Sequence, residues 1–496
     1  MKDVTKLFRP NIANLKAYTS ARQTANADTG ILLDANENPR GRYNRYPDPY
    51  STEVRNLYSD FVGIPSSNIF AGSGSDEVID LLFRVFCEPK RDCVITLDPT
   101  YGMYRVCADI NDVQVISIML TDDFQIDVET TLSACVPDTK IIFVCSPNNP
   151  TGNLIREQDV FALCEGFDGI VVVDEAYIEF AGDISLAKEV LGYKNLVVTR
   201  TLSKAWGAAG VRVGFAIACE EIIDALNKVK PPYNVPVPSQ EIAAGVLREG
   251  FDVTSILSER DRVKSALQMF GLTVLPSDAN FLVFKVPNAS DIQRALQECG
   301  VVIRDRSSMP KMENCLRISI GTTYENDRFL TELAKLLKKV AFIDRDGVIL
   351  SENQIDFQND SLEKYEMLPG VIEGLRKLRK EGYMLVMVTN QDGLGTDSFP
   401  EENFWLVQDK MIRDLRDVGI EFDDVFICPH FPQDNCECRK PKIGMVRKFL
   451  DTTPMNYAAS FVVGDRESDM ELASNIGIRG IKGELNGNFL TTIANA

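Results

Sequence analysis

Histidine is almost absent from this chain, which has one, His430, among 496 residues. Ser-His-Asp catalysis and metal sites built from several imidazoles are therefore excluded, because the imidazoles are missing. Basic residues are also few, with 53 Lys and Arg against 72 Asp and Glu, and the formal net charge is −19. The parts before and after residue 340 are both acidic. Nucleic acid and anionic membranes are therefore not expected partners.

Long apolar runs are missing as well. No stretch approaches the roughly 18 apolar residues of a membrane span, and the N-terminus has no apolar core of a secretory signal. We therefore expect a cytoplasmic protein without a membrane span. The hydrophobic share of 45% and the charged share of 25% are typical of a globular chain.

The twelve cysteines divide into two groups by their spacing. Nine are scattered singly, several in apolar runs, and are expected to be free thiols, most of them buried. The other three, Cys428, Cys436 and Cys438, cluster with His430. This pattern favours a reducing compartment and one metal site over a disulfide scaffold.

Short apolar runs alternate with helical periodicity, which is typical of parallel sheets with connecting helices. We expect strands at residues 140–145, 169–173, 195–198, 340–343, 384–388 and 461–463. Polar residues follow these runs directly, at the strand ends where open α/β sheets bind ligands.

The joint between two domains is expected near Lys339. A helical pattern covers residues 326–339, and the next strand opens at Val340 with no flexible linker. The prolines of residues 229–238 predict a crossing between two lobes of the first domain.

Lys204 stands on a glycine-rich turn after the run 195–198. A simple phosphate-binding loop could also carry a lysine among glycines and hydroxyls. It would not be a P-loop, because the residue order G-x-x-x-x-G-K-[ST] is absent. Upstream, Asp174 ends a buried apolar run, and the blocks 72–77, 98–102 and 146–152 add glycines, hydroxyls, a tyrosine and amides. A lysine, a buried acid, an aromatic ring and a phosphate cradle are what pyridoxal phosphate requires.

Together these blocks resemble fold-type I aminotransferases, and more closely the histidinol-phosphate aminotransferases, over nearly all of residues 10–338. The resemblance implies that Lys204 forms the Schiff base and shuttles protons, and that Asp174 pairs with the pyridine nitrogen. The other cofactor contacts that it implies are Tyr177 and Asn149 at O3′, Tyr101 on the ring, and Gly74, Ser75, Asp76, Thr201, Ser203 and Arg212 at the phosphate. Tyr46 would reach the cofactor from the other subunit of a homodimer.

The same resemblance implies a substrate anion site formed by Arg304 and Arg317, with Tyr18 nearby. A guanidinium fork can hold the α-carboxylate of glutamate in one half-reaction and a substrate phosphate in the other. The implied substrates are glutamate and imidazole acetol phosphate, which give histidinol phosphate.

Asp344 and Asp346 follow the run 340–343, and polar blocks after two later strands contain Thr389, Asn390 and Asp465. An acidic pair standing alone would be an ordinary turn. The ordered blocks, with Lys440 between them, resemble the haloacid dehalogenase phosphatases, which have a Rossmann-like fold. Val348 stands where that motif usually has threonine.

This second resemblance implies that Asp344 is the nucleophile and that Asp346 protonates the leaving oxygen and then activates water. Mg²⁺ would be bound by Asp344, the backbone carbonyl of Asp346, and Asp465. Thr389, Asn390 and Lys440 would hold the phosphoryl oxygens.

Cys428, His430, Cys436 and Cys438 supply three thiolates and one imidazole with no open position, which favours structural zinc over a redox or chance thiol group. A zinc loop before Lys440 narrows the resemblance to the histidinol-phosphate and heptose bisphosphate phosphatases, and the spacing matches the former better. An imidazoleglycerol-phosphate dehydratase, often fused to the former, is excluded because it needs histidine-rich metal sites.

The two halves predict consecutive reactions of histidine biosynthesis, the second being hydrolysis of histidinol phosphate to histidinol. The alternative within enzymes is an aromatic or broad-specificity aminotransferase fused to a sugar-phosphate phosphatase. A pyridoxal-binding regulator with a zinc-stabilised interaction module is the alternative from another class.

We expect two domains, residues 1–338 and residues 340–496. The first should have a large lobe at about 45–229 and a small lobe formed by about 1–44 and 230–338.

Overall fold

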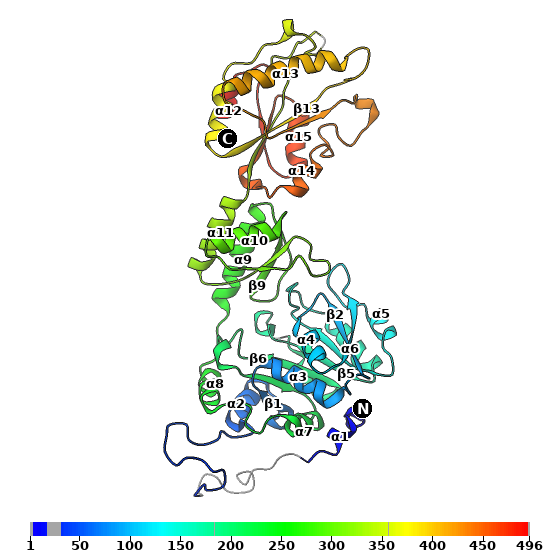
Figure 1. The fold of residues 1–496 in the computed structure, drawn as a ribbon, viewed down its shortest axis with the longest axis vertical. Helices are drawn as coiled ribbons and strands as arrows, with labels where there is room; N and C mark the ends of the chain where they lie inside the picture. The colour runs from blue at the N-terminus through cyan, green and yellow to red at the C-terminus, as the bar shows by residue number, and fades with distance from the viewer. Residues whose placement is uncertain (1–2, 17–30, 183, 356, 495–496) are drawn as a thin grey trace.

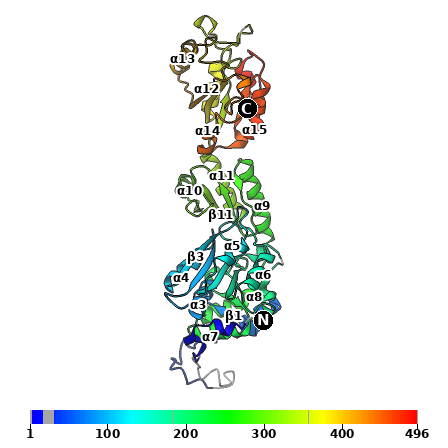
Figure 2. The same cartoon turned by 90° about the vertical axis from the view of Figure 1, so that its right-hand side faces the viewer.

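The computed structural model describes residues 3–16, 31–182, 184–355 and 357–494. Three sheets follow one another along the long axis of the molecule, and Figures 1 and 2 show them as three successive bodies. The seven-stranded sheet lies at one end, the four-stranded sheet in the middle and the five-stranded sheet at the other end. In the described part of the chain, no helix has the length and apolar character needed to cross a membrane.

The first body is a mixed sheet with strand order β1-β7-β6-β5-β4-β2-β3, in which β7 is antiparallel to both neighbours and the remaining pairs are parallel. Its central strands are buried along almost their whole length, as expected for strands with helices on both faces. Its elements are α1 (Pro10–Ala13), α2 (Thr52–Val62), β1 (Ile69–Gly72), α3 (Ser75–Phe86), β2 (Cys93–Asp98), α4 (Met103–Ile110), β3 (Gln114–Met119), α5 (Val128–Ser133), β4 (Thr139–Cys145), α6 (Glu157–Gly166), β5 (Ile170–Asp174), β6 (Leu196–Thr201), β7 (Gly214–Ile217), α7 (Glu220–Val229) and α8 (Val237–Glu249).

The second body is an antiparallel sheet of order β10-β11-β9-β8 with its own apolar core. Its elements are α9 (Thr254–Met269), β8 (Thr273–Val274), β9 (Phe281–Lys285), α10 (Ala289–Glu298), β10 (Arg304–Asp305), β11 (Cys315–Ser319) and α11 (Thr323–Leu336).

The proline-rich segment 229–238 is not the crossing between these bodies, which corrects the expectation above. It joins α7 to α8, and α8 packs on α2 with Ala243 and Ala244 in the core of the seven-stranded sheet. The crossing comes later, through α9. Ile256 on this helix contacts the core of the first body, and Val263 lies in the core of the second.

The third body is a parallel sheet of order β14-β13-β12-β15-β16 with an apolar cluster on each face. Its elements are β12 (Lys339–Ile343), α12 (Val371–Lys380), β13 (Tyr383–Asn390), α13 (Glu401–Asp417), β14 (Asp424–Cys428), α14 (Arg447–Thr452), β15 (Phe461–Gly464), α15 (Glu467–Ile476), β16 (Arg479–Lys482) and α16 (Phe489–Thr492). All six strands expected from the sequence are present, with bounds shifted by at most three residues.

The second and third bodies are joined directly. The helix α11 ends at Leu336 and β12 begins at Lys339, so the linker is as short as the sequence predicts. Lys338 continues a backbone ladder with residues 454–456, and the N–H of Tyr457 donates to the carbonyl of Phe270 at 3.1 Å. These contacts fix the orientation of the third body on the second.

Candidate active sites and a cysteine-histidine cluster

Four neighbouring strands of the first sheet end at one cavity of about 760 Å³. Tyr101 follows β2, Asn149 follows β4, Asp174 ends β5 and Lys204 follows β6. The structure thus brings together residues that are a hundred positions apart in the chain. Parallel strands present their carboxyl ends at one edge of the sheet, which explains the convergence.

Asp174 is buried and lines this cavity. Burial raises the pKa of its carboxyl group, while hydrogen bonds from Tyr104, Thr199 and the backbone of Ala176 partly offset the rise. The Tyr104 hydroxyl donates at 2.9 Å and the Thr199 hydroxyl at 3.1 Å. A buried carboxylate held by these donors fits a cationic ring nitrogen.

Lys204 is half-buried, with Nζ 5.4 Å from the centre of the Tyr177 ring. Burial lowers the pKa of its ammonium group, and the charge of Arg317 lowers it further. A lowered pKa favours the neutral amine that attacks a carbonyl carbon. The Asn149 amide donates to the Tyr177 hydroxyl at 3.4 Å on the same side of the cavity.

The N-terminus of α3 forms a compact cradle with Arg212. Gly74 precedes the helix with φ +83°, and a Cβ atom there would lie 2.5 Å from the Arg212 guanidinium. Ser75, Asp76, Thr201, Ser203 and Arg212 all line the cavity. Backbone N–H groups, hydroxyls and a guanidinium at a helix start fit a phosphate group. These features and the Lys204–Asp174 arrangement fit pyridoxal phosphate.

Arg304 and Arg317 come from the second sheet and line the same cavity. They face each other across the β10–β11 pair. Arg317 Nη1 donates to the side chain of Asn149. The site therefore lies between the first two bodies.

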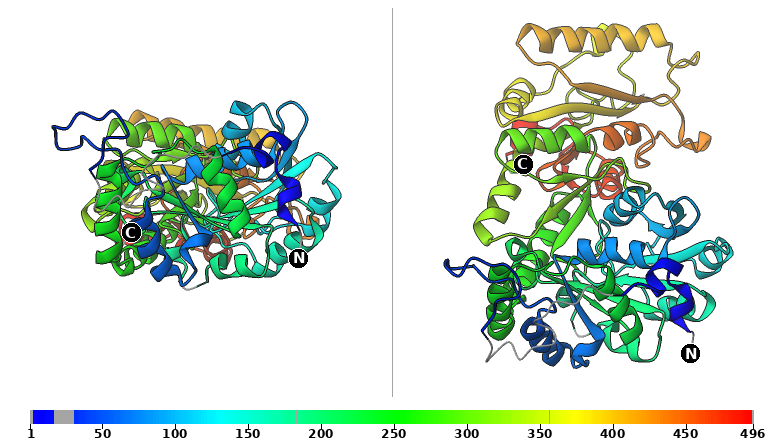
Figure 3. Two further views of the ribbon diagram at one scale, coloured as in Figure 1. Left: turned by 90° about the horizontal axis from the view of Figure 1, so that it is seen from below. Right: turned by 60° about the horizontal axis from the view of Figure 1, so that its bottom comes forward.

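Tyr46 is half-exposed and stacks on Tyr233, with ring centres 4.5 Å apart. It lines a different cavity from the one that holds Lys204. The dark-blue chain that precedes Tyr46 extends away from the first body, as Figure 3 shows, whereas the carbonyls of Asp48 and Pro49 accept hydrogen bonds from Gln240 and Lys230 of that body. Tyr18, the remaining predicted substrate contact, lies outside the described residues.

A second cavity, of about 310 Å³, lies at the strand ends of the third body. Asp344 follows β12 and is buried, with Oδ1 2.8 Å from Lys440 Nζ. Thr389 and Asn390 end β13 beside it, and Lys440 and Asn390 exchange hydrogen bonds through their backbone and amide groups. The predicted phosphoryl-binding residues are therefore brought together with Asp344.

Asp346 is held by a fully buried arginine that the sequence did not single out. Arg345 contacts its carboxylate through Nε and Nη2, and Gln391 and Asn359 each donate at 2.6 Å. The Arg345 guanidinium also lies over the Phe404 ring at 4.7 Å. Burial alone would raise the pKa of Asp346, but Arg345 and these hydrogen bonds lower it overall.

Asp344, Asp465 and Asp469 have carboxylate oxygens within 4.8 Å of one another. Asp469 is already paired with Lys440 at 2.7 Å. Asp465 Oδ1 is buried and has no hydrogen-bond partner among the residues that the structure describes, and burial raises the pKa of its carboxyl group. An orphaned buried carboxylate oxygen beside a second carboxylate fits a hard divalent cation such as Mg²⁺.

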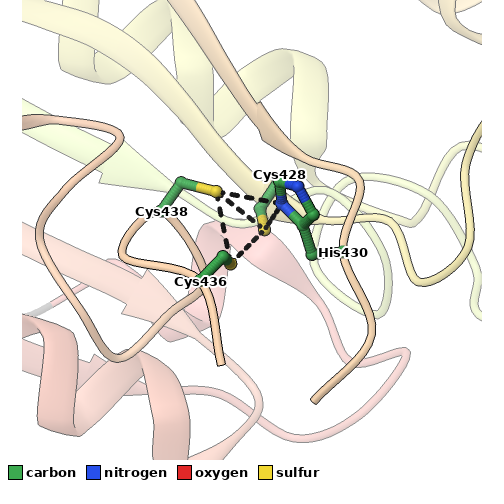
Figure 4. Close-up of side chains that lie close together, drawn as sticks. All are labelled: Cys428, His430, Cys436 and Cys438. Atoms are coloured by element: carbon green, nitrogen blue, oxygen red, sulfur yellow. Dashed lines mark hydrogen bonds between the residues drawn. The ribbon is translucent and has the colours of Figure 1, made fainter. Parts of the chain in front are cut away.

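Cys428, His430, Cys436 and Cys438 form one cluster, and Figure 4 shows the three sulfurs and the imidazole ring turned toward one another. The sulfur–sulfur distances are 3.3 to 3.7 Å, and His430 Nδ1 lies 3.2 Å from Cys438 Sγ. Four ligands at about 2.3 Å from a tetrahedral zinc would lie less than about 4 Å apart. The cluster fits a closed zinc site, and Nδ1 is the histidine nitrogen that would bind it.

None of the remaining nine cysteines forms a disulfide bond, and seven of them are buried. Cys135 is half-buried, and Cys299 is exposed.

Each half of the chain matches the model of a known protein family. Residues 15–333 match the family model for aminotransferase class I and II, and residues 339–479 match the model for polynucleotide kinase 3 phosphatase. Two histidinol-phosphate aminotransferases, from Parabacteroides distasonis and Flavobacterium johnsoniae, are each 46% identical to the chain. They align over 68% of this chain and 99% of their own length.

A solved structure shares the fold of the first two bodies. It is the histidinol-phosphate aminotransferase from Sinorhizobium meliloti in complex with pyridoxal-5′-phosphate, with a TM-score of 0.53 and 23% identity. The alignment covers 58% of this chain and 81% of that one. The chain therefore belongs to the class I and II aminotransferases, within them to the histidinol-phosphate aminotransferase family, and carries a phosphatase-type domain fused to its C-terminal side.

Proposed function

We propose that this chain is a bifunctional enzyme of histidine biosynthesis. Its first half would transfer the amino group of glutamate to imidazole acetol phosphate, and its second half would hydrolyse the resulting histidinol phosphate to histidinol. The observation that carries the proposal is the fusion itself. A member of the histidinol-phosphate aminotransferase family, whose name specifies a phosphate monoester, continues directly into a phosphatase-type domain.

In the first half, pyridoxal phosphate would supply an electron sink for bond cleavage at the substrate α-carbon. Asp174 would hold the ring nitrogen protonated, Lys204 would move the proton at the α-carbon, and Tyr101 would cover the ring. Tyr177 and Asn149 would contact O3′. Arg304 and Arg317 would bind the anionic end of the substrate. The phosphate of the cofactor would lie in the cradle of Gly74, Ser75, Asp76, Thr201, Ser203 and Arg212.

In the second half, Asp344 would attack phosphorus and Asp346 would protonate the leaving oxygen, as in haloacid dehalogenase phosphatases. Asp346 would then take a proton from the water that hydrolyses the aspartyl phosphate. Mg²⁺ bound by Asp344, Asp465 and the Asp346 carbonyl would neutralise charge on the phosphoryl group. Thr389, Asn390 and Lys440 would hold the phosphoryl oxygens.

The cysteine-histidine cluster would bind Zn²⁺ in a structural role. All four ligands come from the chain, which leaves no position for water or phosphate. The cluster immediately precedes Arg439, which pairs with Asp392, and Lys440, which reaches Asp344. Zinc would therefore fix the segment that carries the phosphoryl-binding lysine.

The packing supports a division at Lys338, with residues 340–496 as the phosphatase. Within residues 1–338, the packing of α8 on α2 favours a lobe boundary in residues 250–253, before α9, instead of at residue 230.

A homodimer would bring Tyr46 to the partner's cofactor, and the exposed Ile31 and Leu33 on the same extended segment support an intersubunit role. Twelve cysteines without a disulfide bond among them support a cytoplasmic location.

Two other substrates of the phosphatase half are less favoured. The matched family takes its name from polynucleotides, but a net charge of −19 opposes binding to a polyphosphate backbone. The other alternative is a broad-specificity aminotransferase fused to a sugar-phosphate phosphatase. It leaves unexplained why the first half belongs to the histidinol-phosphate aminotransferases.

The test is release of inorganic phosphate from histidinol phosphate by the purified chain. Release should require Mg²⁺ and stop when a chelator is added. Heptose bisphosphate and a 3′-phosphorylated oligonucleotide serve as competing substrates in parallel assays. Preference for either one by kcat/KM would refute the proposed specificity.

A further inference from the structure

Three arginine side chains from one region of the second sheet line the aminotransferase cavity, one more than the sequence analysis identified. Arg304 of β10 lies directly opposite Arg317 of β11, and the backbone N–H of Arg306 extends the pairing to Cys315 at 2.9 Å. Side chains two residues apart on a strand share a face, so Arg304 and Arg306 emerge on the same side. All three line the cavity that also contains Lys204.

This arrangement is unfavourable in the protein alone. Like charges that face each other across a strand pair destabilise it. In the described part of the chain, no ion pair joins any of the three guanidinium groups to a carboxylate, and the Nε atoms of Arg306 and Arg317 are buried without a hydrogen-bond partner. Burial lowers the pKa of Arg317 to about 10, and the charges of Arg306 and Arg304 contribute to the fall.

An anionic ligand would offset the repulsion among these three arginines and pair their free N–H groups. The number of hydrogen-bond donors indicates which kind of anion binds. A carboxylate has one charge and two oxygens, which one guanidinium fork can satisfy. A phosphate monoester has up to two charges and three terminal oxygens, so it can accept hydrogen bonds from several guanidinium groups at once. Three convergent arginines therefore match a phosphate monoester better than a carboxylate.

We propose that Arg306 is a third phosphate-binding residue, which makes the aminotransferase site selective for substrates that carry a phosphate monoester. The inference rests on the proposed function and deepens it. Glutamate uses the same cavity but needs fewer of these donors, so Arg306 contributes more to binding of the phosphorylated substrate. Inorganic phosphate, the product of the other half of the chain, competes for the same arginines.

The experiment measures the pyridoxal-phosphate-loaded full chain with the variant Arg306→Gln. KM for imidazole acetol phosphate should rise about tenfold or more, as expected for loss of one charge-assisted hydrogen bond. KM for glutamate should change less than about threefold. Competitive inhibition by inorganic phosphate should weaken in parallel with the rise in KM for imidazole acetol phosphate. The matched control is Arg294→Gln, because Arg294 is exposed on α10 and pairs with Asp291 on the same helix.

A purely structural role for Arg306 would raise both KM values together and lower the unfolding temperature. Either that result or an unchanged KM for the phosphorylated substrate would overturn the inference. If Arg306→Gln does not fold, Arg306→Lys provides the same comparison, because it keeps the charge and loses the fork. If the wild-type chain does not transaminate imidazole acetol phosphate, the proposed function fails, a result distinct from failure at Arg306.

Discussion

Lys440 Nζ lies 2.8 Å from Asp344 Oδ1, and both side chains are buried. The lysine follows the cysteine-histidine cluster, whereas the aspartate follows β12, the central strand of the sheet, so this contact links the segment after the cluster to the phosphatase cavity. The two residues are 96 positions apart in the sequence. The stability of the cluster and the chemistry at Asp344 are therefore expected to be coupled.

Replacing Asp344 by Asn should reduce phosphatase activity to background while transamination continues. An amide does not attack phosphorus, and it is a poorer ligand for Mg²⁺. The measurement is phosphate release and transamination from one preparation, with the surface variant Asp417→Asn as the control. A phosphoenzyme trapped on any residue other than Asp344 would show that the assignment is wrong.

Replacing Lys204 by Ala should lower transamination by more than about a thousandfold, because both the cofactor linkage and the proton transfer are lost. The visible absorbance of lysine-bound pyridoxal phosphate should disappear, and phosphatase activity should stay near the wild-type value. Lys188→Ala, an exposed lysine of the same body, is the control. A Lys204→Ala protein that keeps both colour and activity would exclude the proposed role.

Replacing Cys436 by Ser should act through stability. Structural zinc binding contributes up to about 10–16 kcal/mol in small domains, and losing one thiolate forfeits part of it. Zinc content, unfolding temperature and phosphatase activity should fall together, whereas Cys299→Ser, an exposed cysteine, should change none of them. A zinc-free protein with full phosphatase activity is the contrary result.

Replacing Gly271 by Ala should loosen the contact between the two enzymes. Gly271 has φ +82°, and a Cβ atom there would lie 2.2 Å from the Tyr457 ring. Gly300→Ala is a matched control, since Gly300 has φ +80° but no heavy atom of the described residues within 4 Å of the place that a Cβ atom would take. Both variants incur the backbone strain of about 1 kcal/mol, but only Gly271→Ala should speed protease cleavage near Lys339. Equal cleavage rates would show that Tyr457 does not secure the joint.

The two sites should exchange their common intermediate through solvent. Their cavities share no lining residue, and both halves are acidic, so a guiding basic path for a phosphate dianion is not expected. Labelled histidinol phosphate added to the coupled reaction should therefore dilute the intermediate in proportion to its concentration. Histidinol formed without any dilution would demonstrate a channel.

The sequence predicted the strands and their terminal residues well, because buried parallel strands read as apolar runs and motifs follow them directly. It failed at the proline-rich segment 229–238, since prolines mark a turn but do not reveal which core the next helix joins. Tyr104 and Thr199, which hold Asp174, were missed because a tyrosine on a helix and a threonine in a strand have no distinctive pattern. Arg345 was missed because only tertiary packing places its guanidinium in the interior beside Asp346.

The central claim is that one chain carries out two consecutive reactions, and a single coupled assay tests it most directly. The wild-type protein is supplied with imidazole acetol phosphate, glutamate and Mg²⁺, and histidinol and inorganic phosphate are measured. We predict equal amounts of both products, no phosphate from Lys204→Ala, and accumulation of histidinol phosphate with Asp344→Asn. Phosphate release by Lys204→Ala at the wild-type rate, or no histidinol from the wild-type chain, would contradict the account.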